Sequence, residues 1–227
     1  MAAEVPCARG RFSAEDIRRA QFVYGVTDRA WLRGRTLPEC VEAAIAGGAT
    51  FIQLREKAAS RDETVELARQ ILPICRAHNV PFVIDDEVDI ALEVGADGVH
   101  VGQSDMACAA ARAALGPDAI IGVSAQTVEE ALLAQENGAD YLGVGAVIYT
   151  PTKPDAVIVS TEELRAICEA VSIPVVAIGG LNAQTIGDLQ GSGVDGVAVV
   201  SAIFAADDIE SATRELCMIT AQMMGKE

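Results

Sequence analysis

The chain has 227 residues, a formal net charge of −16 and a hydrophobic content of 51%. That length suits one large domain, because single α/β barrels often run to about 200–250 residues. A chain this acidic is a poor partner for nucleic acid or for an anionic membrane surface, which both attract clustered Lys and Arg. We therefore expect small-molecule partners, with no nucleic acid and no membrane. The composition is also compatible with a homo-oligomer.

The cysteines and the N-terminal segment indicate where the protein works. Six cysteines are widely spaced and include no Cys-x-x-Cys pair, which indicates free thiols in a reducing compartment. The N-terminal segment lacks the apolar stretch of a secretory signal, and no run of residues approaches the length that spans a bilayer. We therefore expect a cytoplasmic protein.

A short motif recurs along the chain and indicates the architecture. Gly-Ala-Thr at 48–50, Gly-Ala-Asp at 95–97 and again at 138–140, and Gly-Val-Asp at 193–195 each follow a helical pattern and precede an apolar run. The glycine suits the left-handed position just beyond a helix C-terminus. One helix-to-strand unit is therefore used repeatedly.

The apolar runs predict a parallel barrel. The expected strands cover residues 22–26, 51–54, 81–84, 98–101, 119–122, 141–144, 174–178 and 196–200. Helical patterns lie between them, and Ser60/Glu63, Thr127/Glu130 and Ser160/Glu163 have the spacing of a capping box. This alternation favours the α/β class and a single (β/α)₈ TIM barrel, with an open doubly wound sheet as the fallback. We expect residues 13–227 to form the barrel domain, with a short extra helix starting near Ser13, and residues 1–12 to form a flexible N-terminal extension.

Asp86 and Asp105 are the most informative residues. Each follows an apolar run, at the point where a strand should end. The carboxyl ends of consecutive parallel strands lie side by side at the mouth of a barrel. Two carboxylates brought together there repel each other unless a cation lies between them. Oxygen ligands in small number favour Mg²⁺, which completes its shell with waters and substrate phosphates.

Other strand ends carry phosphate-binding chemistry. These segments are residues 53–57 (QLREK), residues 150–153 (TPTK), Gly179-Gly180 and Val200-Ser201. The last two occupy the usual phosphate site of such barrels, where backbone N–H groups approach the anion. Taken singly, Asp105 could cap a helix, Lys153 could be a solvated loop charge, and His100 is expected to pack inside the barrel. Their convergence on one face favours chemistry on a diphosphate.

Several motifs in order resemble the thiamine-phosphate synthase family. The resemblance covers roughly residues 20–205 and rests on the segments 53–57 (QLREK), 84–86 (IDD), 95–105 (GADGVHVGQSD), 122–125 (GVSA), 150–153 (TPTK), 175–180 (VVAIGG) and 199–203 (VVSAI). It implies a TIM-barrel transferase that joins 4-amino-2-methyl-5-pyrimidinylmethyl diphosphate to hydroxyethylthiazole phosphate. Thiamine phosphate and pyrophosphate are the implied products.

The resemblance also implies roles for individual residues. Catalytic roles fall on Lys57, Ser124 and Lys153, and Mg²⁺ is bound by Asp86 and Asp105. The pyrimidine diphosphate is implied to contact Gln53, Leu54, Arg55, Glu56, Lys57, Asp85, Ser124 and Lys153. The thiazole phosphate is implied to contact Thr150, Pro151, Thr152, Gly180, Val200 and Ser201.

The chain also departs from the family pattern, and other functions stay open. Asp85 stands where the family usually has Asn, Glu87 where Arg is common, and Gln126 where His is common. The alternatives are a thiazole tautomerase-like isomerase, a generic sugar-phosphate barrel enzyme, and a non-catalytic sensor of thiazole phosphate. None of these requires the two metal aspartates together with Lys57, so the synthase is favoured.

Overall fold

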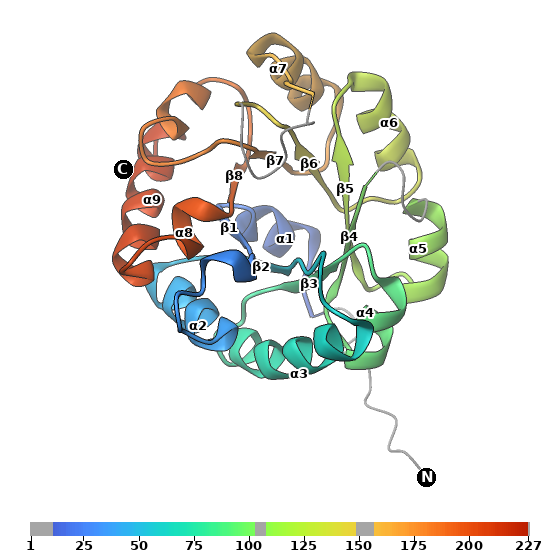
Figure 1. Ribbon diagram of the computed structural model, residues 1–227. Helices are drawn as coiled ribbons and strands as arrows, with labels where there is room; N and C mark the ends of the chain where they lie inside the picture. Colours follow the sequence, from blue (N-terminus) through green and yellow to red (C-terminus); the bar gives the residue numbers. More distant parts are fainter. Residues whose placement is uncertain (1–10, 103–107, 149–156, 227) are drawn as a thin grey trace.

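The computed structural model describes residues 11–102, 108–148 and 157–226. Within these ranges, parallel strands close into a barrel in chain order, with the last strand paired to the first (Figure 1). The strands are β1 (Val23–Val26), β2 (Phe51–Leu54), β3 (Phe82–Asp85), β4 (Gly98–Val101), β5 (Ile120–Ala125), β6 (Tyr141–Val144), β7 (Val175–Ile178) and β8 (Gly196–Val199). The predicted (β/α)₈ barrel is therefore confirmed.

Helices surround the barrel and alternate with its strands (Figure 1). They are α1 (Ala14–Ala20), α2 (Leu37–Gly47), α3 (Arg61–Ala77), α4 (Val88–Val94), α5 (Cys108–Leu115), α6 (Val128–Glu136), α7 (Thr161–Ala170), α8 (Ser201–Phe204) and α9 (Ile209–Met223). Two 3₁₀ helices, η1 (Arg29–Trp31) and η2 (Ile186–Leu189), complete the set. The element that follows β7 is η2, so a short 3₁₀ turn replaces a full helix at that position.

The predicted strand ends agree with the structure to within one residue, except for β5. That strand was expected to end at Gly122, but it continues to Ala125. Its pairing with β6 explains the difference, because Ser124 lies opposite Gly143 and Ala125 lies opposite Val144. Ser124 is therefore held inside a strand, which fixes its position more firmly than a loop would.

Strand residues alternate between two hydrophobic clusters. Tyr24, Phe51 and Tyr141 belong to the cluster that fills the barrel interior. Ile52 and Leu142, each one residue further along a strand, belong to the larger cluster between barrel and helices. This two-residue period is the strand repeat, and both faces of the sheet are buried as in other parallel sheets.

The helix starts follow the expected capping chemistry. In α3, Ser60 accepts a hydrogen bond from the Glu63 backbone, and the Glu63 carboxylate accepts one from the Ser60 backbone. Thr127 and Ser160 also accept from the backbone three residues on. The carboxylate of Glu130, however, accepts from the backbone N–H of Gln126. Serine and threonine at these positions stabilise the helix N-termini by pairing N–H groups that lack intrahelical partners.

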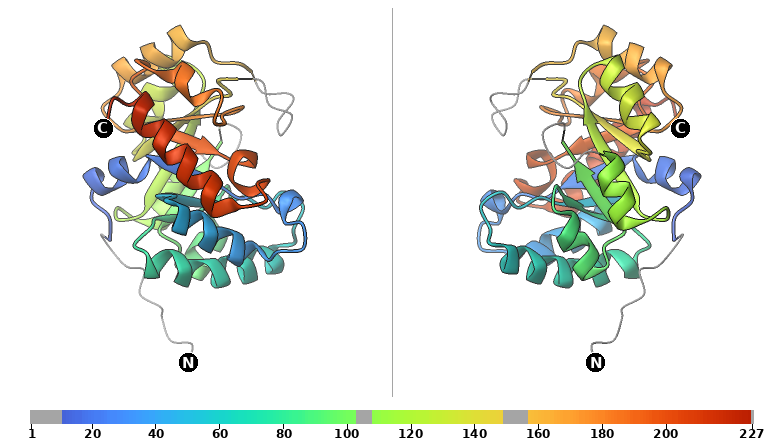
Figure 2. Two further views of the ribbon diagram at one scale, coloured as in Figure 1. Left: turned by 90° about the vertical axis from the view of Figure 1, so that its left-hand side faces the viewer. Right: turned by 90° about the vertical axis from the view of Figure 1, so that its right-hand side faces the viewer.

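The predicted helix near Ser13 is present as α1, and it closes one end of the barrel. Ile17 and Ala20 of α1 pack into the interior cluster. Figure 2 shows α1 at the end of the barrel opposite to η1. The proposed flexible extension falls mostly on residues 1–10, outside the described ranges, while the Arg11 guanidinium lies 3.5 Å from the Asp97 carboxylate.

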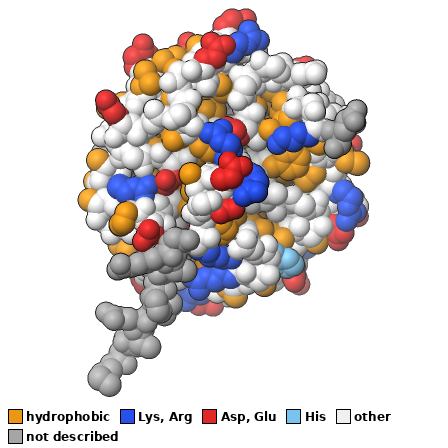
Figure 3. All heavy atoms as spheres, turned by 180° about the vertical axis from the view of Figure 1, so that it is seen from behind, with side chains coloured by type: hydrophobic (Ala, Val, Ile, Leu, Met, Phe, Trp, Pro, Cys, Tyr) orange, Lys and Arg blue, Asp and Glu red, His pale blue; other side chains and the backbone are white. Residues whose placement is uncertain are grey.

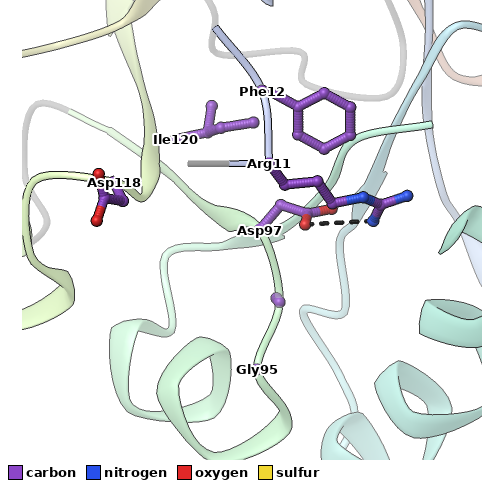
Figure 4. A pocket seen from close by; sticks show the side chains of 7 residues that line it. Arg11, Phe12, Gly95, Asp97, Asp118 and Ile120 are labelled. Carbon is purple, nitrogen blue, oxygen red and sulfur yellow. Dashed lines mark hydrogen bonds and ion pairs between the residues drawn. The ribbon is translucent and has the colours of Figure 1, made fainter. Parts of the chain in front are cut away.

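A small pocket lies at the α1 end, lined by Arg11, Phe12, Asp97, Asp118 and Ile120 (Figure 4). Its charged groups are used by the fold itself. Asp97 accepts from the backbone of Phe82, and Arg11 donates to the carbonyl of Arg76. The pocket lies at the amino ends of the strands, so it is remote from the mouth where such barrels carry out chemistry.

One face of the molecule carries charged side chains of both signs. On the face shown in Figure 3, acidic and basic side chains are interspersed with hydrophobic ones and form no large basic patch. Within the described part of the chain, no helix is both long and apolar enough to cross a membrane.

Candidate active site

Lys57 links two carboxylates at the carboxyl ends of β2 and β3. Its Nζ lies 3.0 Å from Asp85 Oδ2 and makes a second, short contact with Asp86 Oδ2. Arg55 Nε adds a longer contact of 3.7 Å to the same Asp85 oxygen. The sequence placed these residues at neighbouring strand ends, and the structure brings them together in one cluster.

The cluster perturbs the protonation of its own members. Burial raises the pKa of the Asp85 carboxyl, and the negative charge of Asp86 adds to this, while Lys57 and Arg55 oppose it. Burial by itself would lower the pKa of Lys57, but its bonds to Asp86 and Asp85 outweigh burial and raise it. Lys57 therefore stays protonated at neutral pH, and its ammonium is held ready to meet an anion.

Asp86 is held in an uncommon backbone conformation. Its φ is +62°, in the left-handed region that few residues other than glycine, Asn and Asp adopt. Two backbone hydrogen bonds hold this turn: Asp86 N–H donates to the His100 carbonyl at 2.8 Å, and Glu87 N–H donates to the Asp85 carbonyl at 2.8 Å. Such strained positions persist where the surrounding structure determines them, and they concentrate at functional sites.

The predicted metal ligands are only partly described. Asp86 has a side-chain exposure of 20%, so its carboxylate is accessible from the mouth. The Lys57 ammonium already occupies a cation's position between Asp85 and Asp86, so the donor set suits a hard cation such as Mg²⁺. Asp105 lies outside the described residues. In the ranges given above, no three His, Cys, Asp or Glu side chains gather closely enough to hold a metal ion.

Inside the barrel, below the lysine cluster, a hydrogen-bonded row of polar side chains connects Gln53 with Ser124. Gln53 Nε2 donates to the Tyr24 hydroxyl at 2.8 Å, and the Tyr24 and Tyr141 hydroxyls lie 2.8 Å apart. His100 Nδ1 lies 3.0 Å from the Tyr141 hydroxyl, and His100 Nε2 lies 3.0 Å from Ser124 Oγ. Two predicted site residues are therefore joined through three residues that were not predicted to take part.

His100 is partly buried, as expected for a residue packed inside the barrel. Its burial lowers the pKa of the imidazole to about 4, against a smaller opposing effect of the Asp86 charge. Burial also raises the pKa of Tyr141 well above its ordinary value. The histidine and the tyrosines are therefore neutral at pH 7.

Glu56 and Leu54 take structural positions. The Glu56 side chain is only 4% exposed and accepts a 2.6 Å hydrogen bond from Arg29 Nε. Burial raises the pKa of Glu56 in spite of that partner. Leu54 is buried in the layer between barrel and helices. Neither side chain is therefore turned to the mouth in the way the prediction of substrate contact would require, and Glu56 instead ties the β2 end to η1.

The glycine turn after β7 packs against the segment that follows β6. Gly180 has a φ of +72°, and a Cβ placed there would lie 2.7 Å from Ile148 Cβ. Ile148 N–H also donates to the Gly179 carbonyl at 3.1 Å. The sequence indicated that these glycines let a phosphate approach. The structure adds that they let two strand-end loops pack together.

The end of β8 and the β7 loop complete the mouth. Val200 and Ser201 lie at the junction of β8 and α8, and Ser201 is exposed. Asn182 and Thr185 both donate side-chain hydrogen bonds to the Gly180 carbonyl, at 3.3 and 3.2 Å. Sequence reasoning missed these two residues. The signal that could have indicated a fixed turn is the glycine pair followed by Asn, with Thr three residues after the Asn.

The remaining predicted residues cannot be placed. Thr150, Pro151, Thr152 and Lys153 lie outside the described residues, as does Asp105.

The residues missed inside the barrel are Tyr24, His100 and Tyr141. Their positions, at alternate residues of predicted strands, indicated that they face inward, but no pattern in the sequence showed that they would join into one row.

The closed parallel barrel, with lysine, carboxylates and glycine turns at its mouth, is of the class of (β/α)₈ enzymes that act on small phosphorylated substrates. The sequence model described as thiamine monophosphate synthase matches residues 23–203. The chain belongs to that family, and it is a transferase.

Individual relatives agree with the family match over most of the chain. The thiamine-phosphate synthases of Clostridium beijerinckii and Ruminiclostridium cellulolyticum are 53% and 52% identical over 194 and 197 residues. The matches cover 86% and 87% of this chain, and 93% and 94% of the relatives. The solved structure of thiamine phosphate pyrophosphorylase from Pyrococcus furiosus has a TM-score of 0.85 and 42% identity, and covers 92% of this chain and 100% of its own.

Proposed function

We propose that the protein is a thiamine-phosphate synthase. It joins 4-amino-2-methyl-5-pyrimidinylmethyl diphosphate to hydroxyethylthiazole phosphate and releases pyrophosphate. The observation that carries the proposal is the Lys57–Asp85–Asp86 cluster at the mouth of a barrel whose relatives are synthases. A protonated lysine between two carboxylates, next to an arginine, suits a diphosphate that arrives together with a divalent cation.

The pyrimidine diphosphate fits the side of the mouth formed by β2, β3 and β5. Lys57 and Arg55 supply positive charge for the diphosphate, and Gln53 and Ser124 supply polar groups for the ring. Asp85, buried and hydrogen-bonded to Lys57, keeps the ammonium in place. We propose that Lys153 contacts the same substrate.

Asp86, with Asp105, is proposed to hold Mg²⁺, which when bound would offset negative charge on the diphosphate. The Asp86 backbone turn is fixed by β4, so the carboxylate reaches the mouth without needing a loop to reorganise. The Lys57 ammonium can then release its contact with Asp86 and turn to the phosphate oxygens.

The reaction needs a leaving group and a nucleophile, and the substrates supply both. The C–O bond between the pyrimidinyl methylene and the diphosphate breaks, and its electron pair leaves with pyrophosphate. The thiazole nitrogen lone pair then forms the new C–N bond. The electron-rich aminopyrimidine stabilises positive charge on the methylene carbon, so the chain's residues act by charge stabilisation and by proximity.

The thiazole phosphate is proposed to bind on the other side of the mouth. Gly180, Val200 and Ser201 lie after β7 and β8, where barrels of this class bind phosphate through backbone N–H groups. The residues 150–152 are assigned to the same substrate. Free cysteines have no part in this scheme: burial raises the pKa of the Cys75 and Cys168 thiols to about 12, so they are poor nucleophiles at pH 7.

The alternative functions use less of the site. A tautomerase or a sensor of thiazole phosphate would need the β7 and β8 loops but not the lysine–aspartate cluster. A sugar-phosphate enzyme would leave that cluster unexplained in the same way. The relatives described above are synthases, which does not support these alternatives. We further propose that the protein acts in the cytoplasm on these soluble phosphates.

Release of pyrophosphate, measured with one or both substrates present, tests the proposal. The purified protein should release pyrophosphate at a high rate only when both substrates and Mg²⁺ are present. Lys57→Ala should raise the KM for the pyrimidine diphosphate more than the KM for the thiazole phosphate. Gly180→Val, which adds a side chain where the phosphate should approach the backbone, should do the reverse. Turnover of the thiazole phosphate alone would indicate an isomerase, and binding without turnover would indicate a sensor.

A further inference from the structure

One arginine connects the loops that follow the first and the last strand of the barrel. Arg35 ends the loop of residues 27–35, here called the β1 loop, and directly precedes Thr36, the N-cap of α2. Its guanidinium donates hydrogen bonds to backbone carbonyls on both sides: Leu32 at 3.1 Å and Trp31 at 3.2 Å in the β1 loop, and Ala206 at 2.9 Å, Phe204 at 3.2 Å and Asp207 at 3.3 Å in the segment after β8. Because β1 pairs with β8, Arg35 spans the seam at which the barrel closes (Figure 1).

The hydrogen-bonding capacity of Arg35 is directed at the backbone. A guanidinium carries five N–H donors in a rigid planar fork. The contacts of Nε, Nη1 and Nη2 number one, two and two, which matches the hydrogens on each nitrogen. Phe204 ends α8, where helix carbonyls lack intrahelical partners, so the fork also caps this helix. Arg35 therefore acts on the position of the main chain, not as a ligand of the substrate.

Through α8, Arg35 reaches the residues assigned to the thiazole phosphate. This helix is a single turn that begins at Ser201 and ends at Phe204. Phe204 N–H donates to the Val200 carbonyl at 3.0 Å, while the Phe204 carbonyl accepts from Arg35. The Phe204 ring is only 1% exposed and faces β1, where a Cβ on Gly25 would lie 3.6 Å from its Cε2. The position of Phe204 therefore sets the position of Val200 and Ser201.

The β1 loop is in turn fixed to the end of β2, so it is a firm support for α8. The Thr27 hydroxyl oxygen accepts from the Arg55 backbone N–H at 3.0 Å. Arg29 Nε donates to the buried Glu56 carboxylate at 2.6 Å. Both of these partners belong to the segment that carries Lys57. The loop thus connects the side of the mouth proposed for the pyrimidine diphosphate with the side proposed for the thiazole phosphate.

We propose that Arg35 is a positioning residue for the thiazole phosphate, because it holds the Val200–Ser201 turn in place through α8. The inference rests on the proposed function. A phosphate that binds to backbone N–H groups depends on the position of the main chain, which cannot adjust as a long side chain can. The reaction also requires the thiazole nitrogen to lie within reach of the methylene carbon. A displaced turn should therefore weaken binding of the thiazole phosphate and leave binding of the pyrimidine diphosphate as it was.

The first test compares the KM values of the two substrates in Arg35→Gln, which keeps a polar side chain but removes the fork. The KM for the thiazole phosphate should rise by roughly 10-fold or more, and the KM for the pyrimidine diphosphate should stay within about 2-fold of wild type. A purely structural loss would lower the amount of folded enzyme, which reduces the apparent kcat and leaves KM unchanged. An unchanged KM for the thiazole phosphate, or an equal rise of both KM values, would overturn the proposal.

Arg112→Gln is the matched control. Arg112 on α5 also donates to backbone carbonyls, those of Ala119 at 2.6 Å and Gly138 at 2.8 Å among them, and it pairs with Asp140. These contacts precede β5 and β6, so they lie at the end of the barrel away from the mouth. Both KM values should stay within about 2-fold of wild type, with thermal unfolding as the check on stability. A rise in the KM for the thiazole phosphate equal to that in Arg35→Gln would overturn the proposal.

Arg35→Lys separates geometry from charge, and it also serves if Arg35→Gln fails to fold. Lysine keeps the positive charge, but its ammonium is a point charge without the planar fork. The KM for the thiazole phosphate should still rise, by roughly 3-fold or more, because carbonyls at the end of α8 lose their partners. A wild-type KM in this variant would show that the charge matters and the fork does not, which would overturn the proposal.

Two measurements need no turnover. Calorimetric titration with hydroxyethylthiazole phosphate alone gives its Kd, which should also rise in Arg35→Gln and stay unchanged in Arg112→Gln. Trp31 is the only tryptophan of the chain, and its carbonyl accepts from Arg35. Acrylamide should therefore quench its fluorescence more strongly in Arg35→Gln than in wild type or in Arg112→Gln. Equal quenching in all three proteins would show that Arg35 does not hold the β1 loop and would overturn the proposal.

The outcomes separate this inference from the proposed function. If wild-type protein bound the thiazole phosphate but formed no thiamine phosphate, the proposed function would fail, and the titrations of the variants would still decide the role of Arg35. If wild-type protein failed to bind the thiazole phosphate, with or without pyrophosphate and Mg²⁺, the assignment of the Val200–Ser201 turn and the role of Arg35 would both be overturned.

Discussion

Lys57 is the residue on which the two aspartates of the mouth converge. Its ammonium offsets both carboxylates, one buried at the end of β3 and one partly exposed in the turn that follows. In water such a pair would contribute little, but partial burial strengthens each charge interaction. Arg55, 3.7 Å from Asp85, supplies the second positive charge, so the cluster is a local region of balanced charge in a chain whose net charge is −16.

Asp86→Asn should lower the rate of thiamine phosphate formation by roughly 100-fold or more, because the Mg²⁺ proposed to offset charge on the diphosphate would lose a carboxylate ligand. Asn tolerates the left-handed backbone that Asp86 adopts, so the fold should be retained. The measurement is kcat at saturating substrates and Mg²⁺, with circular dichroism as the check on folding. A folded variant with near-normal kcat would remove Asp86 from the metal site.

Asp85→Asn should keep or improve activity at low Mg²⁺. The family's usual Asn both donates and accepts hydrogen bonds, whereas an ionised Asp only accepts. The additional charge lies beside Asp86, so the cation must offset one more negative charge in this chain. The measurement is the Mg²⁺ concentration at half-maximal rate, which should fall in the variant. A large loss of rate at every Mg²⁺ concentration would show that the Asp85 carboxylate has a positive role.

The sequence predicted the cluster at the mouth better than it predicted the barrel interior. Lys57, Asp85 and Asp86 follow apolar runs, so their position at adjacent strand ends came directly from the strand pattern. Tyr24, His100 and Tyr141 lie inside strands, where an inward-facing aromatic residue is most simply a core residue. These residues lie on β1, β6 and β4, which are not neighbours in the barrel, so their polar atoms meet only across the closed interior. The strand pattern alone does not show which side chains meet there.

At the scale of elements, the capping boxes tie helix stability to pH. The Glu63 carboxylate accepts from the backbone of Ser60 at 2.8 Å and from its hydroxyl at 2.9 Å. These hydrogen bonds, the backbone one first, lower the pKa of Glu63 below its ordinary value of 4.5. A carboxyl whose pKa is lower when folded stabilises the fold above pH 4.5, and this contribution is lost as the pH falls through the folded pKa.

In wild-type protein the free energy of unfolding should fall as the pH drops below 4.5. In the Glu63→Gln variant it should fall less steeply. Ser60→Ala, which removes the other half of the box, should cost about 1 kcal/mol at pH 7. Both effects are measured by urea unfolding as a function of pH. Glu42→Gln, an exposed charge on α2, is the control. If it flattened the pH dependence as much as Glu63→Gln, the cap would not be the cause.

The elements themselves were largely predictable, and the exceptions have physical causes. The recurring glycine motif placed helix ends, and the apolar runs placed strands to within one residue at most positions. The predicted end of β5 was wrong. The pairing of β5 with β6 continues past Gly122, and this pairing sets the length of the strand. The packing role of Gly180 was missed for a similar reason, since its partner Ile148 is distant in sequence.

At the scale of the whole molecule, the closed barrel explains why residues far apart in sequence act together. Closure pairs β8 with β1, so the segments after β7 and β8 come round to the side of those after β1 and β2 (Figure 1). Strand–helix alternation predicted this architecture. Parallel strands need crossover connections, which are usually helices, and these helices cover the faces of the sheet. It did not predict that α1 would close the opposite end of the barrel.

The central claim is that this mouth joins two phosphorylated substrates with the help of Mg²⁺. The most direct measurement is the initial rate of thiamine phosphate formation, followed by mass spectrometry, in protein treated with a chelator and then restored with Mg²⁺. We expect one thiamine phosphate for each pyrophosphate released, a rate at least roughly 100-fold lower without metal, and full recovery when Mg²⁺ is added. No thiamine phosphate from both substrates with Mg²⁺ present, or the same rate with and without metal, would contradict the account.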